Sequence, residues 1–166
     1  MIKIRVQSLG LDQTTKSPVV ILQEEEGPRV LPIWIGPAEA SAIAMEMQGM
    51  KPQRPQTHDL LKQILIGLGG DLRRVVISAV KENTYFAELL IRRDDHVFQV
   101  DARPSDSIAL ALRMRAPIYT SIMAGVRVAS SSTRVSPLST ACLDSTCNSS
   151  SRVGSQHRCF NDSDCR

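Results

Sequence analysis

The segment VLPIWIGPAEASAIAMEM, residues 30–47, has a counterpart in VFQVDARPSDSIALALRM, residues 97–114. Each segment begins with a short apolar run typical of a β-strand. A proline, an acidic residue two positions later and alternating alanines then indicate a helix. A shift of 67 residues places Pro37 on Pro104 and the acid of one segment on the acid of the other. This agreement in strand, helix start and helix pattern predicts an internal duplication.

Further strands are predicted before each of the two segments. Charged turns at residues 24–28 and 94–95 separate apolar runs and therefore predict two hairpins. Each copy is a strand, a hairpin and a helix, and neither copy can bury its apolar helix face alone. We predict an α/β (α+β) fold in which the two copies form one mixed sheet covered by helices. The predicted strands are residues 2–6, 19–22, 30–35, 72–80, 85–93 and 97–103.

A third helix is predicted between the two copies. Thr57 is a good helix cap, and glycines at 67, 69 and 70 end the pattern. Between them, apolar residues recur at helical spacing and form one stripe. Because a proline cannot donate to a ladder, Pro32 predicts an edge strand or a bulge. The stripe consists of Leu60, Leu61, Ile64, Leu65 and Leu68.

The composition is that of a globular protein with an aliphatic core. Apolar residues make up 42 % of the 166 residues and aromatic residues only 4 %. The net charge of +3 lacks the strong basic excess of a dedicated nucleic-acid binder. No apolar run approaches the ~20 residues of a membrane span, and residues 1–6 lack the continuous apolar run of a secretory signal. Residues 1–120 contain no cysteine, which fits a reducing compartment, so we expect a cytoplasmic protein without a membrane partner.

The composition changes at residue 121. Residues 121–166 are rich in serine, and apolar periodicity fades there. All four cysteines lie in this segment with the spacing C-x4-C-x11-C-x5-C, which lacks the tight pair usual in zinc sites. We therefore predict one domain over residues 1–120 and a disordered tail over residues 121–166.

Two acidic residues at equivalent helix starts are the first candidate site. Glu39 and Asp106 each fall in a first helical turn. An acid there stabilises the positive end of the helix dipole, which is a sufficient structural reason for both. Alternatively, paired carboxylates from the two copies would hold a divalent metal that assists phosphodiester cleavage. Their spacing in the sequence leaves both interpretations open.

Other candidate residues lie at the starts of the second and third helices. His58 and Asp59 follow the cap residue, where a histidine beside an acid could act as a general base or metal ligand. Alternatively, this is an exposed first turn in which Asp59 only stabilises the helix dipole. Arg103 precedes the last helix, where it could receive a phosphate or pair with Asp101. His96 sits beside a predicted hairpin turn and is read as an ordinary turn residue.

Three motifs resemble the bifunctional nuclease domain, in the order found in that family. They are PIWIG at residues 32–36 followed by Glu-Ala at 39–40, RPQTHDL at 54–60, and DARPSDS at 101–107 followed by Ala-Leu-Ala at 109–111. The resemblance covers about residues 2–120. It implies an enzyme, a nuclease that hydrolyses phosphodiester bonds in RNA and DNA, in a duplicated domain that forms a homo-oligomer. The serine-rich tail departs from the family pattern.

The resemblance also places the candidate residues inside family motifs. Asp59, Asp106, His58 and Glu39 are then expected to be catalytic, and Arg103, Ser105 and Arg54 to bind substrate. Mg²⁺ or Mn²⁺, if used, would be held by Glu39 and Asp106 with a further acid such as Glu46 or Asp59 nearby. The alternative is a non-catalytic oligomeric interaction or regulatory module that assembles through its sheet edges or its Ala-rich helices.

Overall fold

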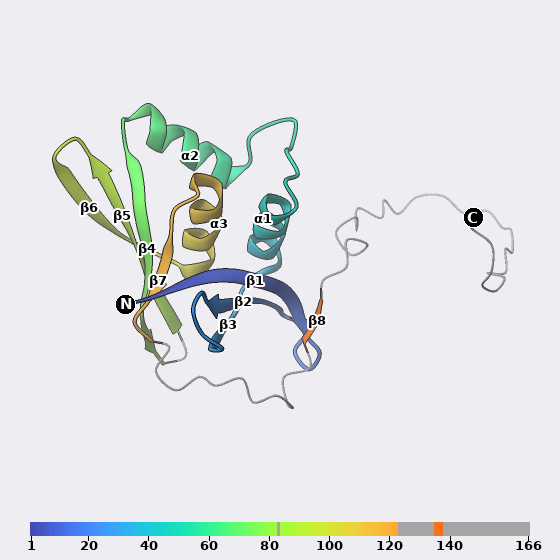
Figure 1. Cartoon of the computed structure of the whole chain (residues 1–166). Coiled ribbons are helices and arrows are strands. Elements are labelled where there is room, and N and C mark those ends of the chain that lie inside the picture. Colours follow the sequence, from blue (N-terminus) through green and yellow to red (C-terminus); the bar gives the residue numbers. More distant parts are fainter. Residues whose placement is uncertain (83, 123–134, 138–166) are drawn as a thin grey trace, which may run out of the picture.

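The computed structural model describes residues 1–82, 84–122 and 135–137 (Figure 1). In these residues two of the three helices lie against one side of a strongly curved sheet, and the third packs on one of them. The helices are α1 (Pro37–Met47), α2 (Thr57–Gly67) and α3 (Pro104–Met114). The strands are β1 (Ile2–Asp12), β2 (Pro18–Glu24), β3 (Val30–Trp34), β4 (Asp71–Lys81), β5 (Thr84–Arg93), β6 (His96–Ala102), β7 (Ile118–Thr120) and β8 (Val135–Pro137).

The sheet joins two equivalent halves. Its strand order is β3-β2-β1-β7-β4-β5-β6, and β8 pairs with β1. Neighbouring strands are antiparallel except for β4 and β7, which are parallel. One half is β1-β2-β3-α1 and the other is β4-β5-β6-α3, and α1 and α3 each have 11 residues. The predicted mixed sheet and its duplicated strand–hairpin–helix units are confirmed.

The strand that contains Pro32 lies at one edge of the sheet. β3 pairs only with β2 in the described sheet, and Pro32 lies opposite Ile21. The Tyr85 hydroxyl donates a hydrogen bond to the Pro32 carbonyl over 3.3 Å, which links the two halves. The prediction of an edge strand is confirmed, because the missing N–H of proline is tolerated where no further strand follows.

Helix α3 is the centre of the core. Eight of its 11 residues are buried, and it contacts α1, α2, β4 and β5. Ser107, Ala109 and Ala111 are each at most 1 % exposed, so small side chains let the helix lie close to its neighbours. Helix α1 uses its own alanines in the same way, with Ala40, Ala42 and Ala44 all buried.

Helix α2 differs from the other two in its burial. It begins and ends close to the predicted residues, but none of its residues is buried. Leu65 packs partly against the core, whereas the other four residues of the predicted stripe are exposed. The reason is tertiary: α3 already covers β4 and β5, so α2 packs on α3 instead of on the sheet.

The segment after residue 120 is only partly described. Residues 135–137 form β8, which pairs with β1 opposite Gly10, Leu11 and Asp12. The four cysteines lie outside the described residues, and the predicted domain boundary and disordered tail stay predictions. None of the described helices has the length and apolar character needed to cross a membrane.

Candidate active site

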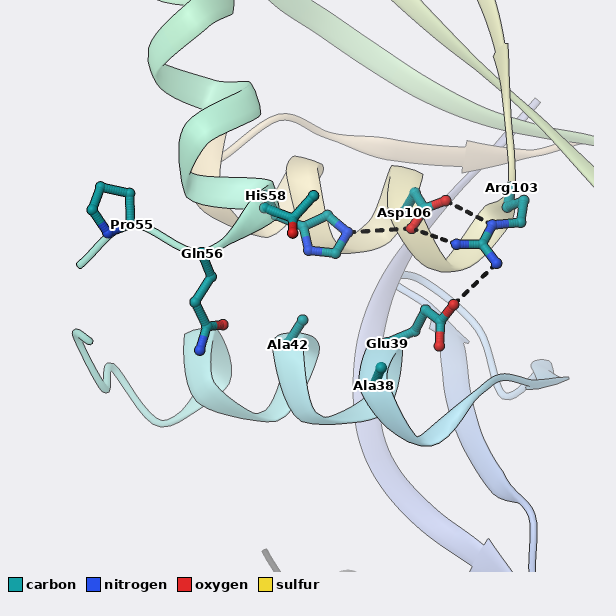
Figure 2. A pocket seen from close by; sticks show the side chains of 9 residues that line it. Ala38, Glu39, Ala42, Pro55, Gln56, His58, Arg103 and Asp106 are labelled. Atoms are coloured by element: carbon teal, nitrogen blue, oxygen red, sulfur yellow. Dashed lines mark hydrogen bonds and ion pairs between the residues drawn. The ribbon is translucent and has the colours of Figure 1, made fainter. Parts of the chain in front are cut away.

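The first turns of all three helices border one cavity (Figure 2). The cavity has a volume of about 460 Å³. Glu39 comes from α1, His58 from α2 and Asp106 from α3, while Arg103 is the N-cap residue of α3. The positive ends of three helix dipoles therefore face a common space. The cavity is lined by Ala38, Glu39, Ala42, Pro55, Gln56, Thr57, His58, Arg103 and Asp106.

Arg103 lies between the two equivalent acids. Its Nε lies 2.8 Å from Asp106 Oδ2 and its Nη2 3.2 Å from Asp106 Oδ1, which is a bidentate contact. Its Nη1 lies 3.0 Å from Glu39 Oε1. The hydrogen bond with Asp106 and the charges of both acids raise the pKa of Arg103. The structure thus pairs Arg103 with Asp106 and Glu39 instead of the expected Asp101, and phosphate binding by Arg103 stays a prediction.

His58 contacts the same carboxylate from the other side. Its Nε2 lies 3.3 Å from Asp106 Oδ1, and only 12 % of the His58 side chain is exposed. Burial raises the pKa of Asp106, but hydrogen bonds from Arg103 and His58 outweigh this effect and hold the pKa below its ordinary value. Asp106 is therefore a carboxylate that contacts the His58 imidazole on one side and the Arg103 guanidinium on the other.

Asp59 does not line this cavity and forms a partly buried ion pair instead. Its Oδ1 accepts a hydrogen bond of 2.6 Å from Arg113 Nε, and its Oδ2 caps α2 by accepting from the Gln56 N–H over 3.0 Å. Arg113 also donates to the carbonyls of Ala109 in α3 and Ala42 in α1. The pair therefore joins all three helices. Asp59 was expected to be catalytic, but the structure places it among the contacts that hold the cavity together.

Arg113, the partner of Asp59, is not among the site residues predicted from the sequence. Its side chain is only 3 % exposed, and its own carbonyl accepts a hydrogen bond from Lys62 Nζ over 2.8 Å. A signal was present in the sequence. An arginine within the mostly apolar pattern of residues 104–114 needs a partner if that face is buried, because a buried charge is costly when unpaired.

The remaining candidates lie outside this cavity. Ser105 is 7 % exposed and lines a neighbouring cavity of about 280 Å³, which shares Glu39 and Arg103 with the first. Arg54 is exposed on the loop before α2, next to the cavity-lining Pro55. Glu46 is wrongly placed for a shared metal site, because it lies seven residues along α1 from Glu39, about 10 Å along the axis. His96 is exposed where β6 begins.

The donor set around Arg103 does not fit the expected divalent metal. The guanidinium already lies between the carboxylates of Glu39 and Asp106, where a bridging cation would have to sit. Within residues 1–82, 84–122 and 135–137, no three His, Cys, Asp or Glu side chains are grouped so that they could hold a metal ion. Magnesium or manganese binding therefore stays a prediction, and no catalytic step is derived through it.

The lowered pKa values predict how the protein responds to acid. Burial raises the pKa of Asp59, but hydrogen bonds from Arg113 and Gln56 lower it below the ordinary 3.8, as for Asp106. Each carboxylate adds stability that is present above about pH 4 and is lost as the pH falls through the lowered pKa. We therefore expect the urea concentration at the unfolding midpoint to decrease as the pH is lowered below about 4. In the double variant Asp59→Asn/Asp106→Asn, the urea midpoint should depend less on pH. A midpoint that falls as steeply as in the wild type would contradict the stabilising role assigned to these two carboxylates.

Comparison with known proteins agrees with the motifs around the cavity. The sequence model of the bifunctional nuclease domain matches residues 20–129, a span that contains Glu39, His58, Arg103 and Asp106. The chain belongs to the bifunctional nuclease domain family. An uncharacterized protein of Mycobacterium tuberculosis is 46 % identical over 117 residues, which cover 70 % of each chain.

Two plant relatives bear the family name. Bifunctional nuclease 2 of Oryza sativa subsp. japonica is 26 % identical over 116 residues, which cover 68 % of this chain and 36 % of the rice protein. Bifunctional nuclease 1 of Arabidopsis thaliana is 27 % identical over 119 residues, which cover 67 % of this chain and 37 % of the plant protein. The chain thus matches about a third of each plant protein.

Proposed function

We propose that this bifunctional nuclease domain hydrolyses phosphodiester bonds in RNA and DNA at the cavity between the three helix starts. The observation that carries the proposal is the convergence of His58, Arg103 and Asp106, which come from two separate motifs, on one cavity with Glu39 from the third. The names of the plant relatives support the same reaction.

Arg103 is suited to receive the phosphate. A guanidinium has five N–H donors, and the contacts with Asp106 and Glu39 use three of them. The Arg103 side chain is 67 % exposed, so its remaining donors are accessible from solvent. The nearby helix starts add a positive potential that favours an anion. In this role Arg103 stabilises the charge that develops on the phosphoryl oxygens.

His58 is suited to act as the general base. Asp106 binds Nε2 and fixes the ring, which leaves Nδ1 to take a proton. A water molecule loses this proton to His58 while its oxygen forms the new bond to phosphorus. The bond from phosphorus to the leaving sugar oxygen breaks, and that oxygen takes up a proton as it departs. Glu39 positions Arg103 from the side opposite Asp106.

One observation favours a non-catalytic module as the second candidate. Two carboxylates surround one guanidinium, so the charge of this cluster offers little net attraction to a polyanion. A module that assembles with partners needs no such attraction, and the same acids would serve as helix-start residues.

The variant Arg103→Met separates the two candidates. We expect it to lower kcat/KM for single-stranded RNA and DNA by about 100-fold, because one donor to the transition-state charge is removed. The matched control is Arg92→Met, at an exposed position on β5 away from the cavity, and it should retain activity. Each sample is assayed with and without a chelator, which tests whether cleavage depends on a divalent metal. Equal cleavage by wild type and Arg103→Met would contradict the role assigned to Arg103.

Binding can be followed separately from cleavage in the same proteins. Trp34 is the only tryptophan of the chain, and it lines the neighbouring cavity that shares Glu39 and Arg103. A cleavage-resistant phosphorothioate oligonucleotide should change its fluorescence in wild type and in Arg92→Met. Arg103→Met should require a higher oligonucleotide concentration for the same change. Binding without cleavage in every sample would favour the non-catalytic module.

A further inference from the structure

Strand β6 leaves one end of the described sheet open. The other end is β3, which has five residues and contains Pro32. β6 has seven residues and no proline, and its pairing with β5 runs from Arg93 opposite His96 to Ala87 opposite Ala102 without a bulge. Natural proteins usually protect a sheet edge with a short strand, a proline or a bulge. β3 is short and contains a proline, whereas β6 has none of these three features, which indicates that β6 pairs with another strand.

The core face of the sheet continues onto β6 beyond the helices. One row of paired residues crosses from Val75 through Leu89 to Val100, and its exposure rises from 0 % through 7 % to 41 %. A second row of paired residues begins at Leu72, which is 4 % exposed, and ends at Phe98, which is 51 % exposed. Phe98 and Val100 therefore extend the buried face into a region that α3 does not cover.

Helix α2 carries exposed apolar side chains on the same side of the sheet. It packs on α3, which itself packs on β5, and Figure 1 shows α2 beside the end of the sheet formed by β4, β5 and β6. Asp71, which begins β4 soon after α2, lies opposite Arg92 near the β5–β6 turn. The exposed side chains are Leu60, Leu61, Ile64 and Ile66 of α2 and Leu68 at its C-cap, between 42 % and 60 % exposed. Apolar groupings of this kind mark interaction sites on soluble proteins.

We propose that a second copy of this chain covers this surface by pairing its β6 with β6 in an antiparallel manner. A register centred on Gln99 uses all seven residues of the strand and places Phe98 opposite Val100 of the partner subunit. It places Asp101 opposite an uncharged valine, so like charges do not meet within the strand pair. The strand is therefore self-complementary about its midpoint, as an isologous dimer requires.

The two-fold symmetry of this dimer also explains the exposed apolar face of α2. Antiparallel pairing of identical strands puts the two-fold axis perpendicular to the sheet, so the helices of both copies lie on the same side. Phe98 and Val100 of both copies then form a continuous apolar floor between the two α2 helices. The exposed apolar side chains of both α2 helices then pack on this floor. A single dimer interface thus covers the open edge of β6, the uncovered face of the sheet and the exposed side of α2. This inference is independent of the proposed nuclease activity.

Sedimentation of the full chain tests the dimer. We expect wild type to sediment as a dimer at micromolar concentrations and Phe98→Asp to raise the Kd of the dimer by about tenfold or more, because it introduces a charge into an apolar contact. Phe98 is half exposed in one copy, so the variant should keep its far-ultraviolet circular dichroism. The matched control Val80→Asp, 44 % exposed on β4, should remain dimeric. A monomeric wild type would overturn the proposal.

A cross-link tests the register. With Cys142, Cys147, Cys159 and Cys165 of the full chain changed to serine, Gln99→Cys should form a disulfide-linked dimer on mild oxidation, because this position faces itself across the two-fold axis. Val97→Cys should cross-link much less, because it lies opposite Asp101 of the partner subunit. A dimer that survives Phe98→Asp and does not cross-link through Gln99→Cys would show that another surface is used. Neither result depends on nuclease activity.

Discussion

Replacing Arg113 with methionine is expected to lower the free energy of unfolding by about 3 kcal/mol or more. The substitution keeps most of the apolar stem but removes the guanidinium that binds Asp59 and the carbonyls of Ala42 and Ala109. These three partners come from the three helices that border the cavity. The loss leaves a mostly buried carboxylate without its cation, which costs more than an exposed charge would. Urea unfolding measures the change.

Two further variants show whether the ion pair is the cause. Arg73→Met breaks an exposed contact of 3.4 Å with Asp71 and should change stability by no more than about 0.5 kcal/mol. Asp59→Leu/Arg113→Met replaces both charges by apolar groups and should recover part of the loss, because it leaves neither charge buried alone. A loss for Arg113→Met as small as that for Arg73→Met would contradict the role assigned to this residue.

Replacing His58 with glutamine is expected to reduce kcat for phosphodiester cleavage by about 1000-fold, within the range that a general base contributes. Glutamine keeps a polar group of similar reach but cannot take a proton from water at neutral pH. Asp106→Asn should also reduce kcat, because the neutral amide holds the imidazole less firmly than the carboxylate does. Single-turnover cleavage of a labelled single-stranded RNA measures both effects.

The second histidine of the domain supplies the control. His96 is exposed at the start of β6, and its ring contacts Phe98 with centroids 6.5 Å apart. His96→Gln should cleave at the wild-type rate per active site. The Trp34 fluorescence change should persist in His58→Gln, because Arg103 still receives the phosphate. Undiminished cleavage by His58→Gln would remove His58 from the mechanism while leaving the dimer and the ion pair of Arg113 untouched.

The site was only partly predictable from the sequence. Glu39 and Asp106 were found because the duplication placed them at equivalent helix starts, and Arg103 because it breaks the symmetry of the repeat. His58 and Asp59 looked equally suited to chemistry as neighbours in one helical turn. Adjacent residues on a helix point about 100° apart, as 3.6 residues per turn requires, so only one of them could face the cavity. The packing of α2 on α3 selected His58.

The sequence by itself determined the strands, the helices and the duplication, because periodicity, turn residues and helix-start prolines act over a few residues. The tertiary structure alone decided which charges meet. Arg113 pairs with Asp59 across 54 positions and His58 meets Asp106 across 48, and no local pattern encodes such distances. The tertiary structure also leaves the apolar stripe of α2 largely exposed, because α3 covers the part of the sheet on which α2 would otherwise pack.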